Sequence, residues 1–206
     1  MGEGALKLDR RFTWADYREW PDDERWEIIA GEAYAMSPSP SSRHQIISAE
    51  LCRQMANFFK GKPCRAIAAP MDVRLSEEDV VQPDLLVVCD PRKIEVTHVE
   101  GAPTLVVEIL SPSSSLRDRA LKTALYAKAR VKEYWIVTPW PSLVEVFVLD
   151  RGGYRLHRAF TKEEELASPA FPELKVTLRD VFDFPLAPEE QPPAVKEPPP
   201  SYRAGR

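Results

Sequence analysis

The sequence predicts a single domain of the mixed α/β class. Two segments carry apolar residues at helical spacing, and around them lie short runs rich in β-branched and aromatic residues, which are typical of strands. The chain has 206 residues, 44% hydrophobic and 29% charged, enough to bury the core of one globular domain. We expect that domain to span residues 12–184, between an N-terminal arm (1–11) and a proline-rich disordered tail (185–206).

The first elements should be a short helix and a β-hairpin. Thr13 can cap a helix over residues 14–20, which the following proline-aspartate cluster should end. Residues 25–30 and 32–38 are short apolar-rich runs on either side of Gly31, a residue suited to the positive φ of a tight turn.

Two longer helices follow from periodicity and composition. Residues 42–60 place apolar side chains on one face, and Gly61 stands where a helix commonly ends in a positive-φ glycine. A second helix should begin at one of the serines 113–115 and run to about Arg130, because its sequence is rich in alanine and leucine.

The remaining apolar runs read as strands. Residues 104–110 are almost continuously apolar, which predicts a central strand covered on both faces. We expect further strands at residues 64–75 and 80–90, joined by an acidic turn at 76–79, and then at 133–139, 143–149 and 154–160, with the last two joined through residues 150–153.

Composition excludes several classes of protein. No apolar run approaches the roughly 18 residues of a transmembrane helix, and the N-terminus has no hydrophobic signal segment, so we expect a cytoplasmic protein without membrane contact. The three cysteines form no CxxC pair, which favours buried free thiols over disulfides or a zinc site.

The net charge and the local charge distribution give opposite indications about nucleic-acid binding. The net charge of −4 provides no general attraction to phosphate. Between Ser115 and Lys132, however, six basic residues face only Asp118, so the second long helix is basic. The basic residues of this helix either contact phosphate groups of a nucleic acid or form an ordinary solvated helix face.

Two carboxylates interrupt apolar strands. Asp84 stands in VVQPDLLVV and Glu108 in TLVVEIL. Burying an unpaired carboxylate costs several kcal/mol, so each needs a cation, a metal or hydrogen bonds. Two acids on neighbouring strands suit Mg²⁺ or Mn²⁺, which prefer oxygen ligands and keep waters that substrate phosphate can displace. The alternative is a pair of salt bridges at strand ends.

The helix after Glu108 supplies a cation. Asp118, Lys122 and Tyr126 are spaced four residues apart, so they share one face of the helix and can overlook the acids. Lys122 could stabilise developing negative charge and Tyr126 could bind a phosphate oxygen. The alternative for Asp118 and Lys122 is an ordinary i, i+4 ion pair.

Taken in order, these motifs resemble the Uma-two family of restriction endonucleases, a branch of the PD-(D/E)xK nucleases. The similarity runs from about Phe12 to Phe184, and its most specific block is Glu108 to Pro139. It is carried by Trp26–Ile29, Gly31-Glu32, Met36–Pro38, His44-Gln45, Pro83-Asp84, the segment EILSPS from Glu108, the D-x-x-x-K-x-x-x-Y spacing from Asp118, and EYWIVTP from Glu133.

The resemblance implies a restriction-endonuclease-like fold, in which helices flank a mixed central β-sheet. It also implies that Asp84 and Glu108, on neighbouring strands, are metal ligands. The superfamily places a lysine two residues after the acid, where this chain has Leu110, so the resemblance points to Lys122 for that role. Members of the superfamily often borrow an acid from an early helix, so Glu27 and Glu50 are supporting candidates. His44, at the start of the first long helix, could also approach the site, although a histidine in that position is more often a capping group.

We therefore expect a Mg²⁺-dependent DNA endonuclease. Cutting both strands of a duplex with one site per chain predicts a homodimer. Two alternatives stay open: an inactive module that binds nucleic acid or protein, which the acidic net charge favours, and a phosphodiesterase acting on RNA or nucleotides. The three compensating charges at Asp84, Glu108 and Lys122 favour an enzyme.

Overall fold

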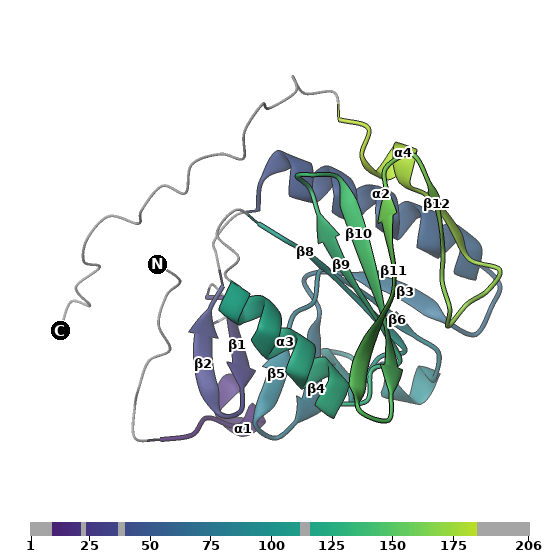
Figure 1. Ribbon diagram of the computed structural model, residues 1–206. Coiled ribbons are helices and arrows are strands. Elements are labelled where there is room, and N and C mark those ends of the chain that lie inside the picture. The colour runs from purple at the N-terminus through teal and green to yellow at the C-terminus, as the bar shows by residue number, and fades with distance from the viewer. Residues whose placement is uncertain (1–9, 22–23, 37–39, 112–115, 185–206) are drawn as a thin grey trace.

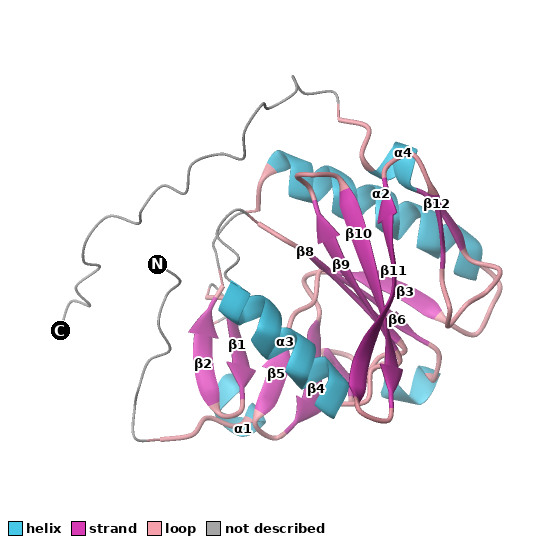
Figure 2. Ribbon diagram, in the orientation of Figure 1, coloured by secondary structure: helices cyan, strands magenta, loops and turns pink. Residues whose placement is uncertain are grey.

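The computed structural model describes residues 10–21, 24–36, 40–111 and 116–184. Its strands form a six-stranded, a five-stranded and a two-stranded sheet (Figures 1 and 2). The helices are α1 (Trp14–Tyr17), α2 (Ser42–Phe59), the 3₁₀ turn η1 (Pro91–Lys93), α3 (Leu116–Lys128) and α4 (Leu178–Val181). The proline-rich tail lies outside the described residues.

The larger sheet is mixed, as predicted. Its order is β11 (Gly153–Thr161), β10 (Leu143–Asp150), β9 (Glu133–Thr138), β8 (Leu105–Ile109), β6 (Leu85–Val88) and β3 (Arg65–Ala68). The central strand β8 runs parallel to β9 and antiparallel to β6, and each of its residues is buried. The continuous apolar run at residues 104–110 is therefore a strand covered on both faces.

The second sheet corrects one prediction. Its order is β2 (Glu32–Ala35), β1 (Trp26–Ile29), β5 (Asp79–Val81), β4 (Asp72–Ser76) and β7 (His98–Glu100). The strands predicted at 64–75 and 80–90 are each split, so that β3 and β6 join the six-stranded sheet and β4 and β5 the five-stranded one. Both breaks contain a proline, Pro70 and Pro83, which has no N–H to donate to a ladder.

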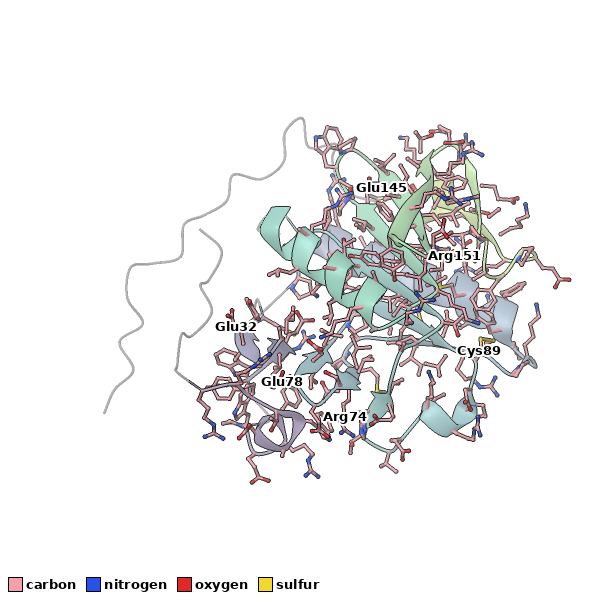
Figure 3. All side chains as sticks on the ribbon, turned by 60° about the horizontal axis from the view of Figure 1, so that its bottom comes forward. Glu32, Arg74, Glu78, Cys89, Glu145 and Arg151 are labelled. Carbon is pink, nitrogen blue, oxygen red and sulfur yellow. A yellow bond between two sulfur atoms is a disulfide. The ribbon has the colours of Figure 1, made fainter. Side chains whose placement is uncertain are left out.

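Two apolar cores fill the spaces on either side of the six-stranded sheet. The first lies between the sheet and α2, with α4 and the hairpin of β12 (Glu165–Ala167) and β13 (Lys175–Thr177). The second is formed with α3 and the five-stranded sheet. In Figure 3, α3 lies between Glu32, Arg74 and Glu78 of the smaller sheet region and Glu145 and Arg151 of the larger one.

Local sequence signals place the early elements correctly. Thr13 and Asp16 form a reciprocal capping box at α1. At the turn between β1 and β2, Gly31 has a φ of +77°, and a Cβ there would lie 2.9 Å from the Cβ of Arg11. Ser41 caps α2, and Gly61, also with φ +77°, follows the C-cap residue Lys60.

The prediction of free thiols is wrong for two of the three cysteines. Cys64 and Cys89 form a disulfide, seen at Cys89 in Figure 3, while Cys52 is a free, half-buried thiol. Arg65 of β3 is paired with Val88 of β6, so the next residues outward, Cys64 and Cys89, face each other. Number and spacing of cysteines do not show this, because the proximity depends on strand register.

Among the described residues, none of the helices is both long and apolar enough to cross a membrane.

Candidate active site

Carboxylates from both sheets converge beneath α3. Glu27 lies on β1 of the five-stranded sheet, and Glu108 lies on β8 of the six-stranded sheet. Leu85 of β6 is paired with Val107 of β8, so the residues one step further, Asp84 and Glu108, lie beside each other across neighbouring strands. The predicted adjacency of the two acids follows from this register.

Lys122 reaches this group from α3. Its Nζ lies 3.0 and 3.1 Å from the two carboxylate oxygens of Glu108 and 2.9 Å from Oε1 of Glu27. Glu27 and Glu108 are only 6% and 9% exposed. The ammonium thus joins an acid of each sheet, and it points toward Glu108 as the helical spacing predicted.

Burial and crowding alter the acid–base properties of Glu108. Burial is the largest influence, and with the nearby carboxylates of Asp84 and Glu27 it raises the pKa of Glu108 to about 7. The ammonium of Lys122 and the hydroxyl of Tyr126 act in the opposite direction. These two partners therefore do not fully offset burial and the neighbouring carboxylates.

The pKa of Lys122 moves the other way. Burial alone would lower it, but the carboxylates of Glu108 and Glu27 outweigh burial and raise the pKa of Lys122 well above its ordinary value. Lys122 is therefore a permanent cation, suited to charge stabilisation and unsuited to act as a general base.

Tyr126 lies on the same face of α3 as Lys122, as predicted, but it contacts an acid of the cluster. Its hydroxyl donates a 2.6 Å hydrogen bond to Oε1 of Glu108, and the side chain is completely buried. Burial and the carboxylate of Glu108 raise the pKa of Tyr126 well above its ordinary value. The neutral hydroxyl of Tyr126 therefore holds the Glu108 carboxylate in place. Because Tyr126 has no exposed surface, it does not contact a phosphate oxygen of a substrate.

Asp84 is held by two groups. Its Oδ2 accepts a 2.7 Å hydrogen bond from the backbone N–H of Ile109, and its Oδ1 lies 3.2 Å from Nε2 of His44 in α2. His44 is 9% exposed, and within the described residues its Nδ1 is buried without a hydrogen-bond partner. His44 thus fixes the orientation of Asp84.

Three of the six basic residues predicted in and after α3 form ion pairs with acids, while Lys128, Arg130 and Lys132 remain exposed at the surface. Lys122 binds Glu27 and Glu108, Arg119 pairs with Glu145, and Lys128 lies 3.0 Å from Asp79. The backbone of Asp118 belongs to α3, but its side chain lies outside the described residues, as do the predicted serine caps at 113–115.

Sequence reasoning underestimated Glu27. In the sequence, Glu27 is one polar residue in an apolar-rich run of the predicted hairpin. In the structure it contacts Lys122 and accepts a 3.1 Å hydrogen bond from the backbone N–H of Gln82. Only the packing of the two sheets brings it to Glu108. The signal available in the sequence was that two apolar residues, Ile28 and Ile29, follow Glu27 on the same strand.

The donor set suits a small hard cation that keeps several waters. Carboxylate oxygens are the ligands Mg²⁺ prefers, usually one or two per protein site. Among the described residues no group of three or more acids, histidines or cysteines is arranged to hold a metal ion, because Lys122 stands between Glu27 and Glu108. Asp84 and Glu108, two carboxylates on neighbouring strands, match the one or two acidic ligands that such an ion usually takes.

Comparison with known proteins agrees with this arrangement. Residues 14–179 match the family described as "Uma2: Putative restriction endonuclease". The chain belongs to the Uma2 family. That membership supports a nuclease-like function, and the matched range contains every residue of the cluster.

Two relatives add to this assignment. An uncharacterized protein from Synechocystis is 32% identical over 127 residues, which cover 60% of this chain and 66% of the relative. The crystal structure of a "putative nuclease belonging to DUF820" from Anabaena variabilis is similar with a TM-score of 0.69 at 21% identity, over 83% of this chain and 97% of that one. This likeness establishes the shared fold.

Proposed function

We propose that this Uma2 protein is a metal-dependent endonuclease that hydrolyses phosphodiester bonds in DNA. The observation that carries the proposal is the ammonium of Lys122 held within 3.1 Å of Glu27 and Glu108, beside Asp84. An apolar core has no use for three crowded carboxylates and one cation, whereas a phosphate-cleaving site needs such charges.

Each residue has a distinct part in the proposed reaction. Asp84 and Glu108 would hold Mg²⁺ or Mn²⁺, which when bound polarises the scissile phosphate and lowers the pKa of a water. Lys122, oriented by Glu27 and Glu108, stabilises the negative charge that develops on the phosphate. Tyr126 and His44 keep the side chains of Glu108 and Asp84 in position.

A cleavage assay tests the proposal. Supercoiled plasmid, single-stranded DNA and RNA are incubated with the protein at several Mg²⁺ and Mn²⁺ concentrations and with EDTA. We expect metal-dependent cleavage of DNA and a loss of about 10²-fold or more in Asp84→Asn. Asp79→Asn is the control, because Asp79 is an even more deeply buried acid and pairs with Lys128 away from the cluster.

Each contrary result removes a defined part of the proposal. Cleavage of RNA alone would make the protein a ribonuclease with the same site. Equal rates in wild type and Asp84→Asn would remove the site. Absence of cleavage under all conditions would favour the second candidate, a binding module, which the mutual neutralisation of Lys122, Glu27 and Glu108 and the net charge of −4 also favour.

We further infer that the protein acts as a homodimer. One site per chain cuts one strand, and a C₂ pair matches the symmetry of a duplex. The edge strand β11 leaves residues 155–159 exposed and offers one surface for such pairing. Light scattering at micromolar concentration should report twice the chain mass of 23.4 kDa; a monomer would contradict this inference.

A further inference from the structure

The segment Gln82-Pro83-Asp84 is the point where the chain crosses between the two sheets. β5 ends at Val81 in the five-stranded sheet, and β6 begins at Leu85 in the six-stranded sheet. The two polar residues of the crossover serve opposite sides of the site. The carboxylate of Asp84 accepts from the backbone N–H of Ile109 beside Glu108, and the backbone N–H of Gln82 donates to the carboxylate of Glu27.

All hydrogen-bonding groups of the Gln82 amide are used. Its Oε1 accepts from Nε and a terminal nitrogen of Arg25 at 3.0 and 2.7 Å. Its Nε2 donates to Oδ1 of Asp72 at 2.7 Å and to the hydroxyl of Tyr17 at 3.1 Å. Gln82 is 9% exposed, so these bonds are shielded from water.

This network holds a strand that has little other attachment at that point. Among the described residues, register pairing between β1 and β5 is confined to Ile28 and Val80. Arg25 stands just before β1, and Glu27 lies within it, so both bonds to Gln82 tie β1 to the end of β5. They replace ladder hydrogen bonds that the two strands do not make.

We propose that Gln82 is a positioning residue for the active cluster: it fixes β1 so that Glu27 holds the Lys122 ammonium against Glu108. The inference rests on the proposed function and explains how Glu27 is held in position within the proposed site. Gln82 acts through Glu27 and does not contact the reacting groups itself.

The chemistry of the site requires a glutamine. Arg25 needs an acceptor, while Asp72 and the Tyr17 hydroxyl take the two protons of the amide. A glutamate in this place would put a second carboxylate beside Asp72. Among the described residues, a methionine would leave Arg25 without its acceptor and Asp72 with the Tyr17 hydroxyl as its one remaining donor. Either change should loosen β1 without removing any catalytic group.

Hydrogen exchange tests the attachment without reference to activity. Gln82→Met should raise the amide exchange rate of residues 26–29 by at least about tenfold relative to wild type. The control is Gln54→Met, because the Gln54 amide also joins two segments far apart in the chain: it bonds the backbone N–H and carbonyl of Thr177 at 2.8 and 3.2 Å. That variant should loosen β13 and leave β1 unchanged. Unchanged exchange in β1 of Gln82→Met would overturn the inference.

A double-mutant cycle tests whether Gln82 works through Glu27. In the cleavage assay, Gln82→Met should lower turnover about tenfold or more, and Glu27→Gln should lower it as well. If Gln82 acts by placing Glu27, its substitution should have little further effect in the Glu27→Gln background. Gln54→Met should keep wild-type turnover at a temperature where it is folded.

The outcomes separate this inference from the proposed function. Full additivity of Gln82→Met and Glu27→Gln, or equal losses in Gln82→Met and Gln54→Met, would show that Gln82 supports only the fold. A wild-type protein that cleaves nothing would remove the proposed reaction and with it the positioning role, while the exchange experiment would still decide whether Gln82 holds β1.

Discussion

Glu108 and Glu133 are two buried acids on neighbouring parallel strands, and they face opposite cores. Glu133, which is 0% exposed, accepts hydrogen bonds from Nε1 of Trp135, Oγ of Ser168 and the backbone N–H of Ala170. All three donors are neutral. Glu108 instead shares its surroundings with a cation, Lys122, and two other carboxylates.

We interpret Glu133 as a structural acid and Glu108 as the acid of the proposed metal site. Burial raises the pKa of both carboxyl groups, but at Glu133 neutral donors compensate and no other carboxylate contributes. At Glu108 two like charges add to burial. Glu133 binds residues 168–170 to β9 by hydrogen bonds. Around Glu108, the carboxylates of Asp84 and Glu27 add negative charge that a divalent cation could neutralise.

The largest expected effect is on catalysis at Glu108. Glu108→Gln should lower DNA cleavage by about 10³-fold, because it removes a proposed metal ligand. Its free energy of unfolding should change by less than about 2 kcal/mol, since glutamine still accepts from Tyr126 and Glu27 still pairs with Lys122. Single-turnover cleavage and urea unfolding measure the two quantities. Loss of fold together with activity would make Glu108 an ordinary core residue.

Lys122 should affect both catalysis and stability. Lys122→Met should reduce turnover of folded protein by about 10²-fold. An exposed i, i+4 pair would have made the change nearly neutral for stability, but Lys122 is buried against Glu27 and Glu108, so we expect a loss of about 3 kcal/mol. Turnover must be compared below the melting temperature of the variant. Wild-type turnover would remove Lys122 from the mechanism.

Glu133 should give the reverse result. Glu133→Ala leaves three buried donors without a partner and should destabilise the protein by about 3 kcal/mol, while cleavage per folded molecule stays at the wild-type level. Glu133→Gln, which keeps an acceptor oxygen, should be milder. Chemical unfolding of both variants checks the order, and a specific loss of activity in Glu133→Gln would undo the comparison.

A further prediction is a pH dependence of stability. The pKa of Glu108 is raised from 4.5 to about 7, so the fold favours its protonated form. The associated stability is fully present below 4.5 and is lost as the pH rises through about 7. In EDTA, the stability of wild type relative to Glu108→Gln should therefore fall between about pH 5 and about pH 8. A flat difference would contradict the raised pKa.

The sequence predicted those features that depend on local pattern. Helix α2 with its glycine end, the first hairpin, the central strand β8 and the helical face shared by Lys122 and Tyr126 all follow from spacing and turn chemistry. Asp84 and Glu108 were recognisable because each interrupts an apolar run.

The features it did not predict depend on how distant segments pack. The splitting of two strands between sheets, the Cys64–Cys89 disulfide and the arrival of Glu27 at Lys122 each require the register or stacking of strands far apart in the chain. Glu133 opens an apolar strand much as Glu108 interrupts one, so sequence alone does not distinguish the structural acid from the functional one.

Cation binding tests the central claim most directly. Isothermal titration with Mn²⁺ is carried out on wild type, Glu108→Gln and Glu133→Gln in parallel. We predict one Mn²⁺ per chain for wild type and Glu133→Gln, and an affinity at least about tenfold weaker for Glu108→Gln. If wild type binds no Mn²⁺, or if the two variants bind it equally, the buried carboxylates around Lys122 are not a metal-dependent nuclease site.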